Sequence, residues 1–223
     1  MKITTTFDVI IVGGGLAGLT SAIHLSSRKK RVLLIEKNEY PKHKVCGEYI
    51  SNEVLPYLNS LGINPINEGA KQITKVHIST TKSNLIKGEL PLGGFGMSRY
   101  FLDNLLVKKT HLNGGQILKD TVDSIHFKKD SFTITTKSSA VFQSKITIGA
   151  FGKRSSLDQK MKRKFIQKKS PYLAVKIHVK GVFPENLVAL HNFKGGYCGV
   201  SKVEDNAINV CYITEYRSFK KHK

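Results

Sequence analysis

The chain has 223 residues, of which 40% are hydrophobic and 23% charged, and its formal charge at pH 7 is +20. This length can bury a sizeable core and make one large or two small domains. No apolar run reaches the roughly 18 residues of a membrane-spanning helix, and the apolar N-terminal stretch is too glycine-rich for a signal peptide. We therefore expect a cytoplasmic protein.

Cysteine and histidine spacing argues against a disulfide framework and against a metal centre. Cys46, Cys198 and Cys211 lie far apart, and none belongs to a CxxC pair. The eight histidines are scattered, without HxxxH spacing. We expect three free thiols and no metal site.

The excess of 36 basic over 16 acidic residues can attract phosphate, anionic lipid or nucleic acid. The lysines are spread along the whole chain, with one cluster over residues 160–169. We interpret them mainly as a solvated surface, and we keep peripheral association with an anionic membrane as an alternative. No nucleic-acid-binding motif accompanies the charge, so we expect no nucleic-acid partner.

The most informative segment is residues 8–18, DVIIVGGGLAG, where an apolar run meets glycines and opens into a helical pattern. Gly13 permits a tight turn, Gly15 lets the backbone approach a pyrophosphate, and Gly18 allows close packing of helix and strand. The N-terminus of the helix favours an anion. We therefore expect dinucleotide contacts from Gly13, Gly14, Gly15, Leu16, Ala17 and Gly18.

The context strengthens this motif, which is weak alone. A helical pattern follows Gly18, and residues 32–35 form a second apolar strand that ends at Glu36. A carboxylate at this position can accept both hydroxyls of an adenosine ribose, and it argues against a 2′-phosphate. We include the adjacent Lys37 in the expected site. The alternative is an ordinary buried strand and turn without a ligand.

The middle of the chain predicts an excursion from this first domain. Pro41 and Gly47 break a loop, which leads into a helix of about ten residues capped by Ser51 or Asn52. From Ile73 the spacing predicts two strands joined by residues 80–84.

The chain is then expected to return to the first domain. Ser98 caps a predicted helix that is stopped by residues 113–115. Short strands follow at 117–118, 122–127, 132–136, 140–142 and 146–148, as a meander expected to cover the nucleotide sheet. Four later strands, near 172–180, 187–192, 197–202 and 207–214, are expected to join the early hairpin in a second domain.

Three motifs together resemble the FAD-dependent oxidoreductases of the para-hydroxybenzoate hydroxylase and geranylgeranyl reductase superfamily. The first is the glycine turn with Glu36. The second, Pro41-x-x-Lys44-x-Cys46-Gly47, is similar to a flavin-proximal loop of the reductase branch. The third, residues 98–106, is similar to the family's arginine helix.

The resemblance implies an α/β fold: a Rossmann-like FAD-binding domain with an inserted, mainly antiparallel β-sheet substrate domain. The FAD-binding domain would be discontinuous, with residues 1–72 and 97–160. Residues 73–96 and 161–223 would form an incomplete substrate domain.

The resemblance also implies roles for single residues. Arg99 would lie near the FAD phosphates and ribityl chain, where a guanidinium suits an anion. The backbone of Val122 would pair with adenine, although Val122 also reads as an ordinary core valine. Lys44, Gly47 and Gly152 belong to the implied cofactor site. Cys46 is the side chain that we name as catalytic near the reactive ring, and a small packing residue is the alternative.

The chain departs from the family pattern at three places. Phe151 replaces the aspartate of the Gly-Ala-Asp-Gly segment, which argues against classical aromatic hydroxylation. Residues 195–200 lack the tryptophan and proline of prenyl reductases. No Gly-Asp segment follows the substrate domain, so we expect a truncated chain or an N-terminal fragment.

The function implied is that of an FAD-dependent oxidoreductase, monooxygenase-like or geranylgeranyl-reductase-like. NADPH or NADH would reduce the flavin, and the substrate would be a small aromatic or lipophilic molecule. The flavin carries such chemistry, so a missing acid–base dyad is no evidence against an enzyme. Two alternatives are a non-catalytic nucleotide-binding remnant or fragment, and a basic surface-binding module. The oligomeric state is left open.

Overall fold

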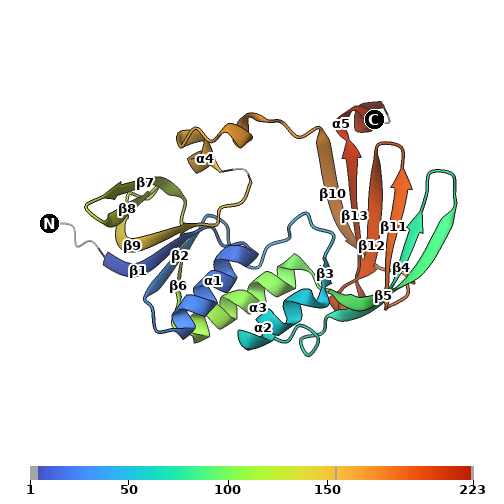
Figure 1. Cartoon of the computed structure of the whole chain (residues 1–223), viewed down its shortest axis with the longest axis horizontal. Coiled ribbons are helices and arrows are strands. Elements are labelled where there is room, and N and C mark those ends of the chain that lie inside the picture. Colours follow the sequence, from blue (N-terminus) through green and yellow to red (C-terminus); the bar gives the residue numbers. More distant parts are fainter. Residues whose placement is uncertain (1–4, 154, 222–223) are drawn as a thin grey trace. The chain divides into compact units, whose positions relative to one another are not determined.

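The computed structural model describes residues 5–153 and 155–221. Within these residues the chain divides into two compact units. The first runs to Lys42 and resumes from Asp103 to Lys169, and the second contains His43–Leu102 and the chain from Ser170 onward. Figure 1 labels the elements of both units.

The first unit contains a six-stranded sheet in the order β6-β2-β1-β9-β8-β7. Its strands are β1 (Thr5–Val12), β2 (Val32–Glu36), β6 (Gln116–Lys119), β7 (Val122–Lys128), β8 (Ser131–Thr136) and β9 (Val141–Gly149). Its helical segments are α1 (Leu16–Ser27), α4 (Ser156–Lys160) and η2 (Lys164–Gln167), and α3 (Arg99–Leu112) enters it at Asp103.

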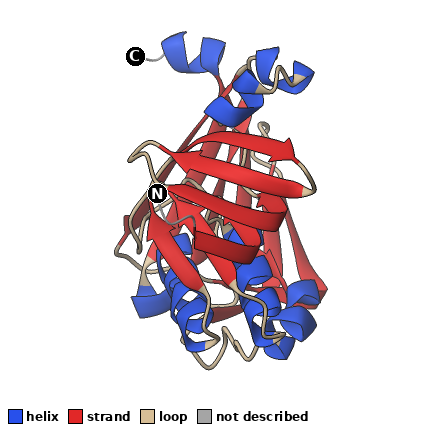
Figure 2. Cartoon of the chain, turned by 90° about the vertical axis from the view of Figure 1, so that its left-hand side faces the viewer, coloured by secondary structure: helices blue, strands red, loops and turns tan. Residues whose placement is uncertain are grey.

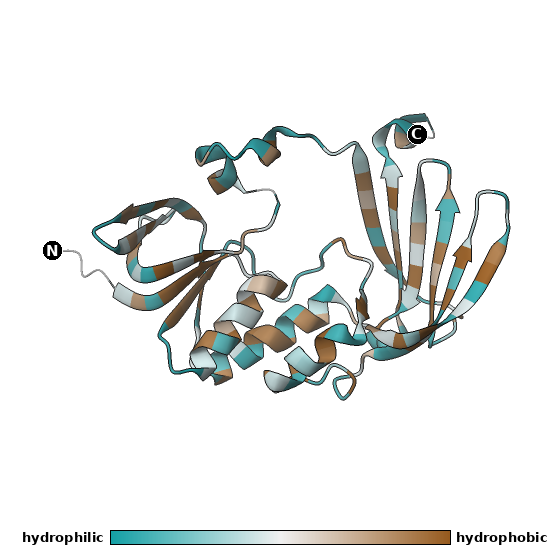
Figure 3. Ribbon diagram, in the orientation of Figure 1, coloured by the Kyte–Doolittle hydropathy of each residue, from teal (hydrophilic) through white to brown (hydrophobic). Residues whose placement is uncertain are grey.

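Residues 9–12 of β1 and residues 32–35 of β2 are all apolar, and brown dominates these strands in Figure 3. They are buried because α1 packs on one face of the sheet, and parallel strands covered on both faces carry near-continuous apolar runs. Figure 2 shows the strands and helices by type. The registers Val12↔Ile35 and Val12↔Gly149 bring the carboxyl ends of β1, β2 and β9 to one edge.

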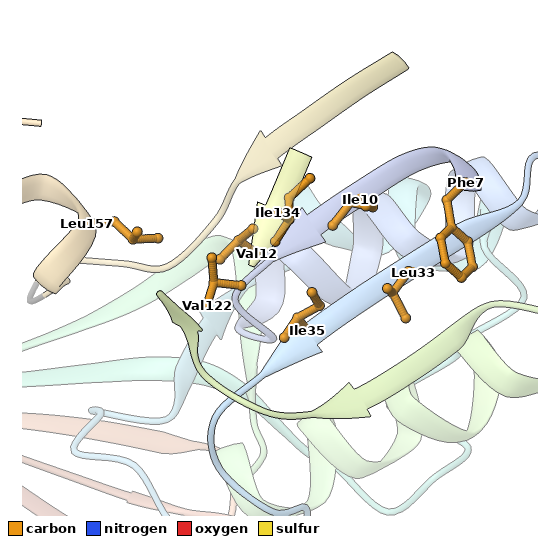
Figure 4. Close-up of a cluster of buried hydrophobic side chains, with 8 residues drawn as sticks. All are labelled: Phe7, Ile10, Val12, Leu33, Ile35, Val122, Ile134 and Leu157. Atoms are coloured by element: carbon orange, nitrogen blue, oxygen red, sulfur yellow. The ribbon is translucent and has the colours of Figure 1, made fainter. Parts of the chain in front are cut away.

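The other face of β1 and β2 is covered by the curled end of the same sheet. Strands β7 and β8 are hydrogen-bonded to the sheet through β9. Figure 4 shows the resulting cluster, which contains Phe7, Ile10, Val12, Leu33, Ile35, Val122, Ile134 and Leu157. The meander therefore extends the nucleotide sheet and also folds over it.

The predicted strands at 140–142 and 146–148 are one strand, β9. The apolar pattern breaks at residues 143–145, but the backbone pairs with β1 from Phe142 to Gly149. Ser144 is buried in that break, where its hydroxyl hydrogen-bonds with that of Thr147 at 3.1 Å. Backbone pairing thus continues the strand where the side-chain pattern stops.

The second unit contains a seven-stranded sheet in the order β10-β13-β12-β11-β4-β5-β3. Its strands are β3 (Tyr49–Ser51), β4 (Lys71–Ser79), β5 (Leu85–Gly96), β10 (Tyr172–Val179), β11 (Leu187–Phe193), β12 (Gly196–Lys202) and β13 (Ile208–Glu215). Its helical segments are η1 (Asn52–Val54), α2 (Leu55–Ser60), η3 (Glu204–Asn206) and α5 (Tyr216–Lys221). All pairings are antiparallel except that of β4 with β11.

The unit boundaries differ from the expected domain boundaries. Residues 43–72 and 97–102 belong to the second unit, not to the first, because β3 pairs with β5 and Met97 N donates to Glu48 O at 3.1 Å. Residues 161–169 belong to the first unit. The sequence pattern did not predict the three-residue strand β3, and this strand moves the boundary.

Candidate functional site

The glycine turn between β1 and α1 lies where the strand order reverses. Strand β1 has β2 on one side and β9 on the other, and open α/β sheets bind ligands at the carboxyl edge of such a switch point. Gly13 has a φ of +103°, and a Cβ there would lie 2.5 Å from the carbonyl oxygen of Ala150. At Gly18 an added Cβ would lie 1.9 Å from Gly13 O. Both positions therefore require glycine.

Gly15 differs from its neighbours because it borders open space. No described atom lies within 4 Å of the place its Cβ would take, and its φ is −79°. Gly15 is also the N-cap of α1, and it provides no side-chain cap. Among the described residues of α1, the first turn contains no acidic side chain. This helix N-terminus therefore fits an external anion such as a pyrophosphate.

Glu36 lies at the end of β2, beside this turn. Its Oε2 accepts a hydrogen bond from Gly14 N at 2.7 Å, and its Oε1 accepts one from Asn38 N at 2.9 Å. Asn38 Nδ2 also donates to Oε1. A carboxylate offers about four lone-pair positions, so about one remains for a further donor such as a ribose hydroxyl. The hydroxyl of Tyr40 donates to Gly14 O at 2.5 Å and helps to fix the turn.

A small pocket of about 80 Å³ connects the turn to the meander. Its lining contains Val12, Gly13, Ile35, Glu36, Lys37, Asp120, Thr121, Val122, Phe151, Ser155, Ser156 and Leu157. The structure thus brings together four of the expected contacts, Gly13, Glu36, Lys37 and Val122.

Val122 begins β7, the edge strand of the sheet, and its side chain is buried in the cluster of Figure 4. An edge strand presents backbone donors and acceptors on its outer side. Gly152 has a φ of +72° and follows the pocket residue Phe151, but it does not line the pocket itself. Arg154, in the same expected segment, lies outside the described residues.

Asp120 lies in the pocket wall and was not among the expected site residues. Burial raises its pKa, but hydrogen bonds from Ser138, Thr136 and Thr121 outweigh burial, and the net pKa is lowered. Thr121 N donates to Asp120 Oδ1 at 2.6 Å, and Asp120 N donates to Glu36 O at 3.0 Å. Asp120 therefore ties the start of the meander to the end of β2.

The remaining expected residues, Lys44, Cys46, Gly47 and Arg99, lie in the second unit. Asn209 is fully buried, and its Nδ2 donates to Gly47 O at 2.8 Å and to Cys46 O at 3.4 Å. No described atom lies within 4 Å of an added Cβ at Gly47. The Cys46–Gly47 loop is thus hydrogen-bonded to β13 through Asn209, and the space beside Gly47 is open. A loop that approaches a planar ligand requires such open space.

The N-terminus of α3 is already occupied by two carboxylates. Arg99 N donates to Glu48 Oε1 at 2.9 Å, and Ser98 N donates to Glu204 Oε2 at 2.8 Å. Ser98 caps the helix as predicted, since its Oγ accepts from Phe101 N at 3.0 Å. The backbone N–H groups of Ser98 and Arg99 are thus satisfied by carboxylates of the protein itself.

Sequence reasoning missed Glu48, which is 0% exposed. Its Oε1 accepts from Lys176 Nζ at 2.8 Å, and its Oε2 lies 2.6 Å from His178 Nε2. Its place directly after Cys46–Gly47 was the one available signal. Among the described residues, no group of three or more His, Cys, Asp or Glu side chains could hold a metal ion. Nor does any helix of that part of the chain have the length and apolarity needed to cross a membrane.

Comparisons with known proteins agree with this arrangement. Residues 8–45 match the family model "FAD dependent oxidoreductase". The chain is 31% identical over 175 residues to an FAD-dependent monooxygenase of Aspergillus versicolor, covering 71% of this chain and 35% of that protein. It is 32% identical over 125 residues to digeranylgeranylglycerophospholipid reductase 1 of Methanothermobacter thermautotrophicus, covering 53% and 31%.

The fold has close counterparts among solved structures. A geranylgeranyl bacteriochlorophyll reductase-like protein from Thermoplasma acidophilum superposes with a TM-score of 0.75 at 18% identity, covering 96% of this chain and 58% of that one. The chain therefore spans little more than half of this structure and about a third of the two relatives. The chain is therefore similar to FAD-dependent oxidoreductases, and geranylgeranyl reductases are among its relatives.

Proposed function

We propose that this chain binds FAD and acts as an FAD-dependent oxidoreductase, with NADPH or NADH as the reductant. The observation that carries the proposal is the uncapped, open N-terminus of α1 at Gly15, preceded by Gly14, whose N–H donates to the Glu36 carboxylate at 2.7 Å. A pyrophosphate suits the first of these features and a ribose suits the second.

The residues of the first unit would bind the adenosine diphosphate half. Backbone N–H groups at the start of α1 would donate to the pyrophosphate, and Glu36 would accept from a ribose hydroxyl. The edge of β7 at Val122 would recognise adenine through the backbone. Lys37 lies beside Glu36 in the pocket lining and adds positive charge to it.

The residues of the second unit would act on the other half of the cofactor. When bound, the flavin ring supplies the redox chemistry. The open loop at Gly47 would let the backbone approach the ring, and Cys46 would be the nearest thiol. The Arg99 guanidinium would pair with phosphate, because a guanidinium can donate two hydrogen bonds to one anion.

We further propose a small aromatic or lipophilic substrate. The name of one relative, digeranylgeranylglycerophospholipid reductase, supports a prenyl lipid and reduction of a double bond. The name of the other, an FAD-dependent monooxygenase, supports hydroxylation.

FAD fluorescence tests the cofactor site directly. Addition of the chain is expected to change the fluorescence of FAD, and ADP is expected to reverse this change while FMN is not, because the pocket would recognise the adenosine diphosphate half. Reversal by FMN alone would contradict this assignment. Oxidation of NADPH or NADH by the FAD-loaded chain then separates an enzyme from a non-catalytic nucleotide-binding protein.

A second proposal concerns the basic segment Lys160–Lys169. Met161 and Phe165 are 47% and 53% exposed within it, among lysines and an arginine. Exposed apolar side chains among cations are typical of segments that attach to anionic membrane surfaces. We therefore propose peripheral membrane attachment. Co-sedimentation at low salt with phosphatidylglycerol vesicles, but not with phosphatidylcholine vesicles, is the expected result, and equal recovery with both would contradict it.

A further inference from the structure

The second unit contains a buried carboxylate surrounded by donors. Glu48 is 0% exposed, and the side chains of Lys176 and His178 are 6% and 21% exposed. Lys176 Nζ and Arg99 N both donate to Oε1, while His178 Nε2 lies 2.6 Å from Oε2. Lys176 and His178 are two residues apart on β10, so both point to the same face of that strand.

The contacts determine how the pair is protonated. A buried carboxylate requires a compensating charge, and Lys176 supplies one. With Lys176 as its countercharge we assign Glu48 as a carboxylate, whose Oε2 accepts a hydrogen bond from Nε2–H of His178. A neutral His178 therefore carries its proton on Nε2 and has its lone pair on Nδ1. Within the described part of the chain, Nδ1 has no hydrogen-bond partner.

The other groups around His178 come from three further elements. The ring of His43, in the loop before Cys46, lies edge-on to it at 5.5 Å and stacks on Tyr100 of α3 at 4.6 Å. On β13, Asn209 is paired with His178, and Cys211 is paired with Lys176. Burial raises the pKa of the Cys211 thiol, and neighbouring thiols and Glu48 raise it further. Among these groups, Lys176 is the cation that balances the negative charge of Glu48.

A partly exposed imidazole held by a buried carboxylate is a recurrent acid–base arrangement. The carboxylate fixes the tautomer and stabilises the imidazolium that forms when the other nitrogen takes a proton. An ion pair with only a structural role would instead leave Nδ1 of His178 inaccessible. The difference lies in whether Nδ1 is free to react.

We propose that His178 is a proton-transfer group of the second unit and that Glu48 is its positioning residue. A substrate proton would pass to Nδ1, and the resulting imidazolium would keep its Nε2–H on Glu48. The reverse step would return the proton to substrate and restore the neutral ring. The substrate role rests on the proposed function, because both hydroxylation of a phenol and reduction of a double bond include a proton transfer at the substrate.

Acylation of histidines by diethyl pyrocarbonate at pH 7, followed by peptide mass spectrometry, tests this inference on the whole chain without cofactor. His126, exposed on β7 of the first unit, is the internal comparison. We expect His178 to react at least as fast as His126 despite its 21% exposure. Reaction about tenfold slower than at His126, as at a protected or protonated imidazole, would overturn the proposal.

Glu48→Gln adds a second arm. It removes the charge but keeps an oxygen, and we expect the rate at His178 to fall about tenfold while the rate at His126 is unchanged. Equal rates at His178 in both folded proteins would contradict the role of Glu48. If this variant does not fold, the ratio of the acylation rates at His178 and His126 in the wild-type protein still tests the proposal. FAD retention is measured on the same samples, so a failure of cofactor binding is distinguished from a failure of the Glu48–His178 pair.

Discussion

The pocket of the first unit and the Glu48 group of the second are built in opposite ways. The site in the first unit depends on backbone groups and on the open space beside Gly15. The N-terminus of α1 has no side-chain cap. The Glu48 group depends on charged side chains, and the N-terminus of α3 is already closed by Glu48 and Glu204. One region is therefore prepared for an external anion, while the other has satisfied its charges internally.

This difference predicts the largest effect on stability in the second unit. Glu48→Ala leaves Lys176 buried without its partner, and loss of one member of a buried ion pair costs about 3–5 kcal/mol. Denaturant unfolding measures this loss. The double variant Glu48→Leu with Lys176→Met removes both charges and should recover most of the stability. A double variant as unstable as Glu48→Ala would show that the charges themselves do not set the cost.

In the first unit, two glycines of the same turn should separate stability from binding. Gly18→Ala places a Cβ 1.9 Å from Gly13 O and should destabilise the protein by about 1–3 kcal/mol, with loss of FAD binding. Gly15→Ala, the matched control, adds a Cβ into open space. Its stability should stay within about 0.5 kcal/mol of wild type while FAD binding weakens. Unchanged FAD binding in Gly15→Ala would argue against a phosphate at this turn.

Glu36→Gln tests the ribose contact with a smaller expected effect. Hydrogen bonds to a charged group contribute about 1.5–3 kcal/mol, so FAD and ADP should each bind roughly tenfold or more weakly. Glu39→Gln is the control, because Glu39 pairs with Lys119 at the surface. Fluorescence titration of both variants makes the comparison, and equal losses would point to general charge in place of a ribose contact.

The smallest expected effect concerns Asp120. Because its hydrogen bonds give a folded-state pKa below the unfolded value of 3.8, its stabilising contribution is present above about pH 3.8 and is lost as pH falls through the folded pKa. Ser138→Ala removes one donor and should lower the unfolding temperature slightly at pH 6. The difference from wild type should shrink at pH 2–3. A constant difference at all pH values would contradict this assignment.

The same contrast explains what could be predicted from the sequence. The segment from β1 to Glu36 was predictable because its signal is local: an apolar run, four glycines and an acid at the end of the second strand, within about thirty residues. Gly13, Glu36, Lys37 and Val122 line one pocket. Asp120 and Ser155 also line this pocket. The way in which the meander folds brings them there, and no local sequence pattern indicates it.

The Glu48 group could not be predicted in the same way. Its members come from positions 48, 99, 176 and 178, and strand pairing alone brings β10 to the loop after Cys46. The unit boundary at residue 43 differs from the expected domain boundary for a related reason, since β3 has only three residues and no period of its own. The Glu48 group and the unit boundary both depend on pairing between strands that lie far apart in the sequence. Side-chain periodicity does not indicate such pairing.

The visible absorption spectrum of the purified 223-residue chain, after addition of FAD and removal of the excess, tests the central claim most directly. We predict that flavin bands stay with the protein and that Gly15→Val, which fills the space at the start of α1, loses them without unfolding. A folded wild-type chain that retains no flavin, or a Gly15→Val variant as yellow as wild type, would contradict the assignment of this pocket to FAD.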